Sequence, residues 1–246
     1  MKKFLLTCSI LLISICVSAQ ALIVIPKIGA TLATVSMSET DIIQFPGFEE
    51  EIKSKIGFII GAALNYSIND MISIQPELNF IQKGYTEKST STWMEDDDGR
   101  LITYENSSSI KYTTNYLEIP VLAKFSFGRE TKFYAIAGPS IGIGLAGKFK
   151  YKIKTVESYD DFTDTYSNSE KGNIKFGKAP DNEGGEDLFI DNRIDFGLQA
   201  GGGILIAHKI IIEARYGLGF SKLYDSDFEI KNRVFQLTIG LPLTLR

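Results

Sequence analysis

Charged side chains recur at alternate positions within otherwise apolar stretches of this sequence. Carboxylates arranged in pairs are the groups that general acid–base catalysis uses, whereas carboxylates next to cations form ion pairs. A β-strand places alternate residues on the same face. Neighbouring strands that carry such residues would therefore bring carboxylates and cations together on one face of the sheet. The residues that we single out as one polar network are Glu77, Glu118, Lys124, Asp195, Glu213 and Arg215.

Nucleophilic chemistry has little support in the sequence. Lipid-modifying hydrolases and acyltransferases typically need a histidine beside a serine nucleophile, and the single histidine, His208, falls in a predicted exposed turn, Ala207–Lys209. Both cysteines, Cys8 and Cys16, lie near the start of the chain. We therefore assign no catalytic residue, no cofactor and no metal site.

Two acidic runs stand in long polar segments. One contains Asp96, Asp97 and Asp98, and the other contains Asp160 and Asp161. Clustered carboxylates suit hard divalent cations, but the calcium-loop pattern needs a bidentate glutamate at a later position that this sequence lacks. We expect acidic surface segments that serve recognition; the alternative is weak bridging to lipopolysaccharide phosphates through calcium or magnesium.

The chain begins with a secretory signal peptide pattern. Lys2 and Lys3 precede an apolar stretch over residues 4–17, and small residues follow up to Ala19. We expect cleavage after Ala19, which divides the chain into a signal peptide, 1–19, and one domain, 20–246. The domain keeps 24 of the 26 basic residues and all 30 acidic ones, a net charge of −6. This balance argues against nucleic-acid binding.

About eight stretches alternate apolar and polar residues with a period of two. In the last, Phe235, Leu237 and Ile239 fall on one face, and Gln236 and Thr238 on the other. The stretches cover residues 23–35, 55–67, 72–80, 116–125, 132–152, 193–206, 210–221 and 235–243. Short turns join some of them; long polar segments join the others, at 34–54, 86–110, 152–192 and 222–231. The pattern predicts an all-β fold, an eight-stranded antiparallel up-and-down transmembrane β-barrel with four long loops.

A soluble β-sandwich or ligand-binding calyx would also alternate. Three features favour a membrane. Charged residues fall on one face of the strands, aromatic residues such as Tyr66, Phe133, Tyr112 and Phe220 collect near strand ends, and an even strand number leaves both termini at the short-turn end. We therefore predict the outer membrane of a Gram-negative bacterium, with periplasmic termini and extracellular loops.

Several motifs resemble an outer-membrane β-barrel family of Bacteroidetes that is often labelled PorT-like. They lie at 115–122, which contains Leu-Glu-Ile-Pro, and at 137–140, 197–203, 214–219 and 232–237. The resemblance covers nearly the whole chain after the leader. It implies a barrel similar to the membrane domains of OmpA and OmpX, and it implies no single activity, although the family's namesake resembles an assembly factor for protein secretion.

The function that follows is a structural or recognition barrel without enzymatic activity. Its lumen would be plugged by polar side chains, because an eight-stranded barrel is about wide enough for its own side chains. The expected partners are outer-membrane lipid, lipopolysaccharide, and envelope or secretion proteins, with no nucleic acid. The alternative is a small-solute channel or an accessory component of a secretion apparatus.

Overall fold

A computed structural model describes residues 22–37, 47–159, 161–180, 187–226 and 229–244. The expected leader, residues 1–19, lies outside these ranges. The strands are β1 (Leu22–Ser36), β2 (Phe48–Ser67), β3 (Ile72–Lys83), β4 (Tyr85–Asp97), β5 (Arg100–Gly128), β6 (Lys132–Tyr159), β7 (Phe162–Phe176), β8 (Leu188–Ile190), β9 (Ile194–Ile206), β10 (Ile210–Gly219), β11 (Lys231–Gly240) and β12 (Leu243–Thr244). No described helix is long and apolar enough to cross a membrane.

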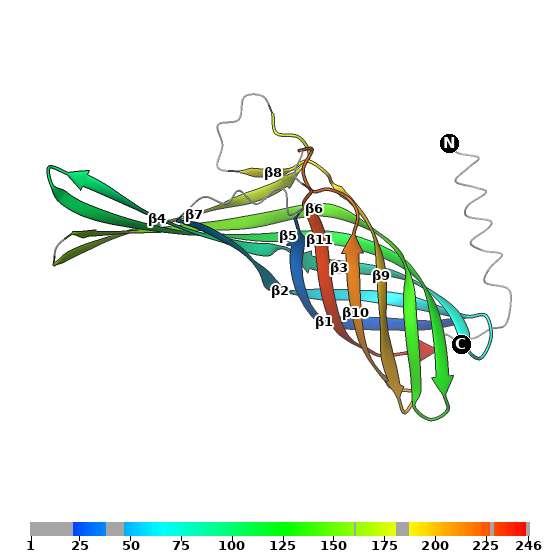
Figure 1. Cartoon of the computed structure of the whole chain (residues 1–246). Helices are drawn as coiled ribbons and strands as arrows, with labels where there is room; N and C mark the ends of the chain where they lie inside the picture. Colours follow the sequence, from blue (N-terminus) through cyan, green and yellow to red (C-terminus); the bar gives the residue numbers. More distant parts are fainter. Residues whose placement is uncertain (1–21, 38–46, 160, 181–186, 227–228, 245–246) are drawn as a thin grey trace.

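Eight of these strands close into a ring, which confirms the predicted all-β barrel (Figure 1). The order around the ring is β1, β2, β3, β5, β6, β9, β10 and β11, and β11 pairs back onto β1 in antiparallel register. The two short strands β12 and β8 are appended to β1 and β7. The eight ring strands correspond to the eight alternating stretches of the sequence.

Each ring strand exposes its apolar residues outward and buries its polar residues inward. On β11, Phe235 and Ile239 are 43% and 54% exposed, whereas Gln236 and Thr238 are 2% and 3% exposed. A water-soluble protein would show the reverse arrangement, because apolar side chains gain free energy by leaving water. The exterior is therefore suited to hydrocarbon.

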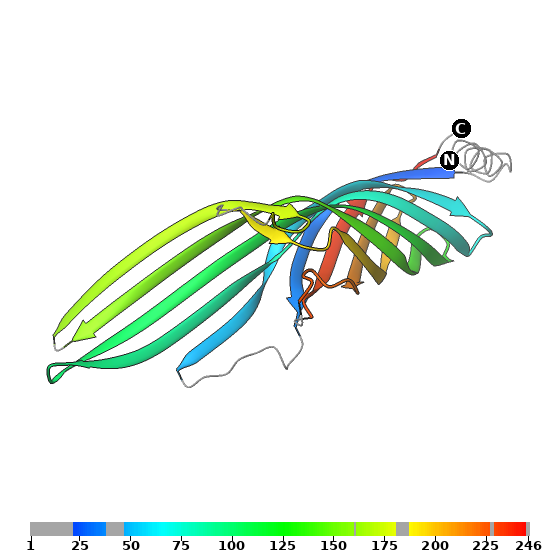
Figure 2. The ribbon, with the colours of Figure 1, turned by 90° about the horizontal axis from the view of Figure 1, so that it is seen from above.

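Two of the four segments predicted as long loops are in fact mostly β-sheet, so this part of the prediction was wrong. Residues 86–110 form β4 and the first part of β5, residues 152–159 form the end of β6, and residues 162–176 form β7. Together with residues 48–54 of β2, they make an open sheet in the order β2, β4, β5, β6, β7. We call residues 48–54, 85–112, 147–159 and 162–176 the extension sheet. Figure 2 shows it as a curved sheet that projects from one end of the ring.

Sequence analysis missed β4 and β7 because both faces of these strands are mostly serine, threonine, asparagine or charged residues. On β6, Phe149, Tyr151 and Ile153 alternate with lysines, and the expected stretch at 132–152 included the first part of this alternation but not its continuation to Tyr159. The turn between β4 and β5 does carry a recognisable signal. Asp98 and Gly99 both have positive φ, 54° and 83°, and Asp-Gly is a preferred pair for a two-residue hairpin.

The extension sheet leaves the ring at a local irregularity. Ile59 pairs with Ile81 but Ser54 pairs with Tyr85, so β2 contains one residue more than the chain opposite it. An extra residue of this kind bends a strand and increases its twist. Gly84 sits between β3 and β4 at φ +136°, a backbone conformation that residues with a Cβ rarely adopt.

Short turns close the opposite end of the ring, which we call the short-turn end. Leu22 and Thr244, the outermost described residues, also lie there, because Leu22 pairs with Tyr66 just before the β2–β3 turn and Thr244 pairs with Ile23. In the turn between β9 and β10, Lys209 N–H donates to Ile206 C=O at 2.9 Å. Ala207 and His208 both have positive φ, 48° and 56°, and His208 is exposed.

The strained turn gives a stability prediction. Replacing Ala207→Asn together with His208→Gly supplies the residues that tolerate positive φ at both positions, so the free energy of unfolding should rise by about 1 kcal/mol. Urea unfolding in lipid vesicles, followed by circular dichroism, measures the change. A lower unfolding midpoint than that of the natural chain would contradict it.

Candidate functional site

The lumen of the ring holds most of the buried charge of the protein. Every member of the network predicted from the sequence is buried there, with side chains from β3, β5, β9 and β10. Residue exposures are 4% for Glu77, 4% for Glu118, 9% for Lys124, 5% for Asp195, 3% for Glu213 and 2% for Arg215. They separate into two linked clusters, one around Glu77 and one around Lys83.

Glu77 is the centre of the first cluster. The guanidinium of Arg215 donates to both of its oxygens, with Nη1 2.9 Å from Oε2, and Lys27 Nζ donates to Oε2. Arg215 also pairs with Glu213. A carboxylate that accepts two parallel bonds from an arginine is held strongly and in one orientation.

Amide and aromatic groups complete this cluster. Gln75 Nε2 donates to Glu77 at 2.7 Å, and Tyr134 OH donates to Glu213 at 2.9 Å. Lys124 Nζ lies 3.7 Å from the centre of the Tyr134 ring and 3.3 Å from Gln75 Oε1. This cluster has three cations, Lys27, Lys124 and Arg215, and two carboxylates, so that its excess positive charge must be balanced nearby.

Lys83 is the centre of the second cluster, nearer to the extension sheet. Its Nζ is 2.9 Å from Glu118 Oε1 and 3.0 Å from Asp195 Oδ2. Gln199 bridges the two clusters: its Nε2 donates to Glu118 at 2.8 Å and its Oε1 accepts from Arg215 at 3.4 Å.

Sequence reasoning missed Lys27 and Lys83. Both occupy inward positions of the period of two. Lys83 follows Glu77 on β3, and Lys27 lies on β1, where no polar network residue was expected. With them, the two clusters contain four cations and four carboxylates. The cations are Lys27, Lys83, Lys124 and Arg215, and the carboxylates are Glu77, Glu118, Asp195 and Glu213. The formal charge of these clusters is zero.

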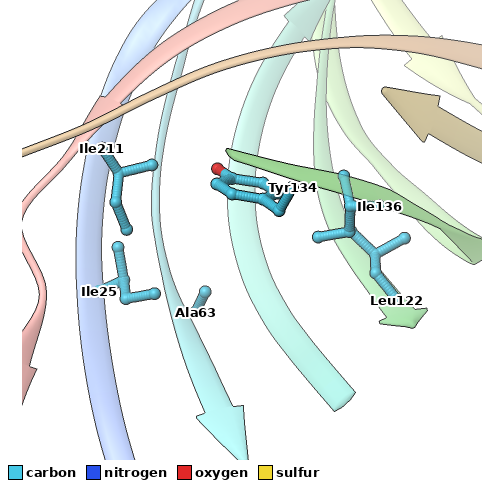
Figure 3. Close-up of a cluster of buried hydrophobic side chains, with 6 residues drawn as sticks. All are labelled: Ile25, Ala63, Leu122, Tyr134, Ile136 and Ile211. Atoms are coloured by element: carbon cyan, nitrogen blue, oxygen red, sulfur yellow. The ribbon is translucent and has the colours of Figure 1, made fainter. Parts of the chain in front are cut away.

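Apolar clusters close the lumen on both sides of the charges. Near the short-turn end, Tyr134, Ile136 and Ile211 meet across the barrel with three further side chains (Figure 3). At the other end, Tyr85, Ile174, Ile190 and Leu223 form an apolar cover over the ring. The Phe176 ring joins this cover to Tyr116 at 5.3 Å between ring centres.

The space left in the described lumen is small. A cavity of about 10 Å³ lies among Lys83, Glu118, Asp195, Asn232 and Gln236, about the size that one water needs. Its walls carry Asp195 Oδ1 and Gln236 Oε1, two acceptors without a protein donor. A second hollow of about 110 Å³ opens at the short-turn end beside Lys124.

The face of the extension sheet that continues the lumen is aromatic. All aromatic residues of β4, β7 and the extension parts of β5 and β6 fall on this inner face by strand register. Trp93 stacks on Tyr104 at 5.3 Å, and Tyr159 on Phe162 at 5.8 Å. Trp93 and Phe162 remain 45% and 68% exposed.

Acidic residues share the inner face. Glu87 is half-buried at the base of the sheet, where Tyr112 OH lies 3.5 Å from its Oε2. Burial raises the pKa of the Glu87 carboxyl, and the negative charge of Glu50 raises it further. The inner face therefore disfavours additional negative charge.

The predicted acidic recognition residues lie at the tips of the extension sheet. Asp96 and Asp97 end β4, Asp98 is in the hairpin turn, and Asp161 precedes β7; Asp160 lies outside the described residues. Asp96 Oδ1 accepts the Gly99 N–H at 2.8 Å, which stabilises the turn. In the described ranges, no three histidine, cysteine or acidic side chains come together as metal ligands.

Comparison with known proteins agrees with this architecture. A family profile described as "Outer membrane protein beta-barrel domain" matches residues 20–225. The chain belongs to this outer-membrane β-barrel family. It is accordingly a protein of the outer membrane of Gram-negative bacteria. No functionally curated protein matches its sequence.

Solved structures of similar arrangement include three small outer-membrane barrels. Ail, the attachment invasion locus protein of Yersinia pestis, is 14% identical, with 91% of this chain and 99% of that chain covered at a TM-score of 0.37. Neisserial surface protein A is 12% identical, with 90% and 97% covered at 0.32. The outer membrane protease OmpT from Escherichia coli is 11% identical, with 93% and 98% covered at 0.30.

Arg215 gives the sharpest test of the lumen network. Arg215→Met removes the two parallel hydrogen bonds to Glu77 and the close pair with Glu213, and leaves Lys27 as the remaining cation near both buried carboxylates. The free energy of unfolding should therefore fall by about 3–5 kcal/mol. Lys209→Met, which removes a cation from an exposed turn, is the matched control and should change it by less than about 0.5 kcal/mol. Equal effects of the two substitutions on urea unfolding would show that the buried pairs are unimportant.

Proposed function

We propose that this protein is a closed outer-membrane scaffold that holds a recognition sheet outside the cell. One observation carries the proposal. The ring is filled and covered, whereas β5 and β6 continue far beyond it as part of the extension sheet. The exposed edges of a long sheet carry a risk of aggregation. We therefore infer that strands this long beyond the membrane serve a function.

A closed lumen is supported by the layers inside the ring. An ion on its way through would have to separate the Lys83–Asp195 and Arg215–Glu77 pairs and then pass the apolar cluster around Ile136 and Ile211. Removing one partner from a buried pair leaves an uncompensated charge at high cost. The described side chains thus favour a plug over a path.

Recognition by the extension sheet is supported by its exposed side chains. Trp93, Phe162 and Tyr166 are 45%, 68% and 60% exposed on the inner face near its far end. Exposed aromatic side chains are enriched at protein interfaces, and aromatic anchors often dominate binding energy. The acidic tips at Asp96, Asp97, Asp98 and Asp161 would add charge selectivity around this patch.

The orientation belongs to the same proposal. The short-turn end, with Leu22 and Thr244, would face the periplasm, and the extension sheet would face the exterior, as outer-membrane barrels place short turns inside and long connections outside. The barrel exterior would contact outer-membrane lipid and lipopolysaccharide. Envelope or secretion proteins are the expected protein partners, and nucleic acid is not expected.

The alternatives differ in what the lumen must do. A small-solute channel needs a continuous path, and a PorT-like accessory role in secretion needs a stable contact with an export apparatus. Enzymatic activity is not proposed, because the lumen carboxylates Glu77, Glu118 and Glu213 are all engaged by cations or amide groups.

Planar-bilayer recording separates the scaffold from the channel. The mature chain should insert without steady conductance at either polarity, because the charges and apolar clusters fill the ring. Insertion is verified independently by the heat-dependent gel mobility of protein recovered from the same lipid. Steady openings that change in Glu118→Gln would overturn the closed-scaffold proposal and favour the channel.

A further inference from the structure

The outer face of the extension sheet has a different chemistry from its inner face. Strand register places eight lysines there, namely Lys53, Lys88, Lys111, Lys148, Lys150, Lys152, Lys154 and Lys171. The face also carries four acidic residues, Glu49, Glu51, Asp96 and Glu105, and Glu51 pairs with Lys53 at 2.9 Å. The lysines outnumber these carboxylates two to one, and no aromatic residue of the extension sheet falls on this face.

Three of these lysines lie directly opposite one another across adjacent strands. Lys111 of β5 pairs in register with Lys150 of β6, and Lys150 pairs in register with Lys171 of β7. Directly opposite residues in an antiparallel pair have Cβ atoms about 4.5–5.5 Å apart. We call Lys111, Lys150 and Lys171 the lysine row.

Like charges directly opposite each other destabilise a sheet. All three side chains of the row are exposed, and within the described ranges none of them forms a salt bridge. The sheet therefore contains an uncompensated line of positive charge. A ligand with several negative charges would remove the repulsion and gain ion pairs at the same time.

In the proposed orientation, with Leu145 taken as the edge of the hydrocarbon, strand geometry puts the row at the height of the lipid head groups. Leu145 of β6 is 43% exposed on the lipid-facing side, and Lys148 and Lys150 follow three and five residues later on the same strand. At about 3.3 Å per residue these lysines lie roughly 10 and 17 Å farther along the strand. A strand tilt of about 35–45° lowers this to roughly 8 and 13 Å above the hydrocarbon, the level of the polar layer.

We infer that the outer face of the extension sheet binds the phosphate groups of lipopolysaccharide in the surrounding leaflet, with the lysine row as the central contact. The outer face continues the lipid-facing surface of the barrel, so lipopolysaccharide is the polyanion that stands beside it. This inference rests on the proposed orientation, with the extension sheet outside the cell.

A groove of the extension sheet, farther from the membrane than the lysine row, can bind the sugars of lipopolysaccharide. It has a volume of about 680 Å³ and is lined by Lys88, Lys152 and Lys154 together with hydroxyl groups such as those of Ser107, Ser109 and Ser169. Hydroxyl and ammonium groups are hydrogen-bonding partners for sugars and phosphates. A phosphorylated core saccharide anchored at the lysine row would enter this groove.

Binding to rough-type lipopolysaccharide in detergent, measured by calorimetry on the mature full-length chain, tests the inference. The triple variant Lys111→Gln, Lys150→Gln, Lys171→Gln should bind about tenfold more weakly, the size expected for the joint loss of three exposed ion pairs. The matched control removes three cations at the short-turn end, Arg129→Gln, Lys132→Gln and Lys209→Gln, and should bind as the natural chain does.

Comparison of different ligands shows whether the surface binds the phosphate groups of lipopolysaccharide or a soluble polyanion. Chemically dephosphorylated lipopolysaccharide should bind as weakly to the natural chain as the intact form does to the triple variant. Equal binding of the two lipopolysaccharides, or of the triple variant and its control, would overturn the inference. Tighter binding of soluble heparin than of lipopolysaccharide would overturn it too, because the surface would then serve a soluble polyanion.

Lys150→Glu separates binding from folding. It places a carboxylate between two lysines, so urea unfolding should show a sheet at least as stable as the natural one, while lipopolysaccharide binding falls as in the triple variant. A less stable sheet would contradict the repulsion on which the inference depends. Because these measurements need no cell, they remain informative if the proposed orientation or the closed lumen proves wrong.

Discussion

The structure depends on one constraint, the pairing of every backbone N–H and C=O group within the part of the chain that faces hydrocarbon. A strand edge in lipid would leave a row of such groups without partners, at several kcal/mol each. The ladder between β1 and β11 removes that edge by closing the ring. Once the ring is closed, the period of two forces each strand to give one face to lipid and the other to the lumen, as Phe235 and Gln236 do.

A ring of eight strands then determines what the lumen can be. The interior is only about wide enough for side chains, so charged groups placed there must satisfy one another. Glu77 does so with Arg215 and Lys27, and Lys83 does so with Glu118 and Asp195. Tyr134, with its ring among apolar residues and its hydroxyl on Glu213, joins the charged layer to the apolar one. The same side chains that stabilise the ring also close it.

The barrel was predictable because alternation in the membrane part is between apolar and polar residues, the contrast that sequence analysis detects. The inward placement of Glu118 and Arg215 followed from that period, but their partners did not, because pairing across the lumen depends on shear and register. Lys27 was missed on the least regular stretch, and Lys83 at the end of another. The alternation of Phe149 and Tyr151 with lysines on β6 fell within an expected stretch, but β4 and β7 were missed because they carry polar residues on both faces and so lack that contrast.

The extension sheet carries the distinctive chemistry of this protein, with its aromatic groups on one face and its lysines on the other. Its position outside the cell is the claim on which function depends. Cysteine labelling in intact cells tests it most directly, because the only natural cysteines, Cys8 and Cys16, fall within the expected leader. With a membrane-impermeant maleimide, Thr163→Cys, exposed near the far end of β7, should react in intact cells, and Asn69→Cys at the short-turn end should react only after the cells are opened. Reaction of Asn69→Cys in intact cells with protection of Thr163→Cys would contradict the proposed arrangement.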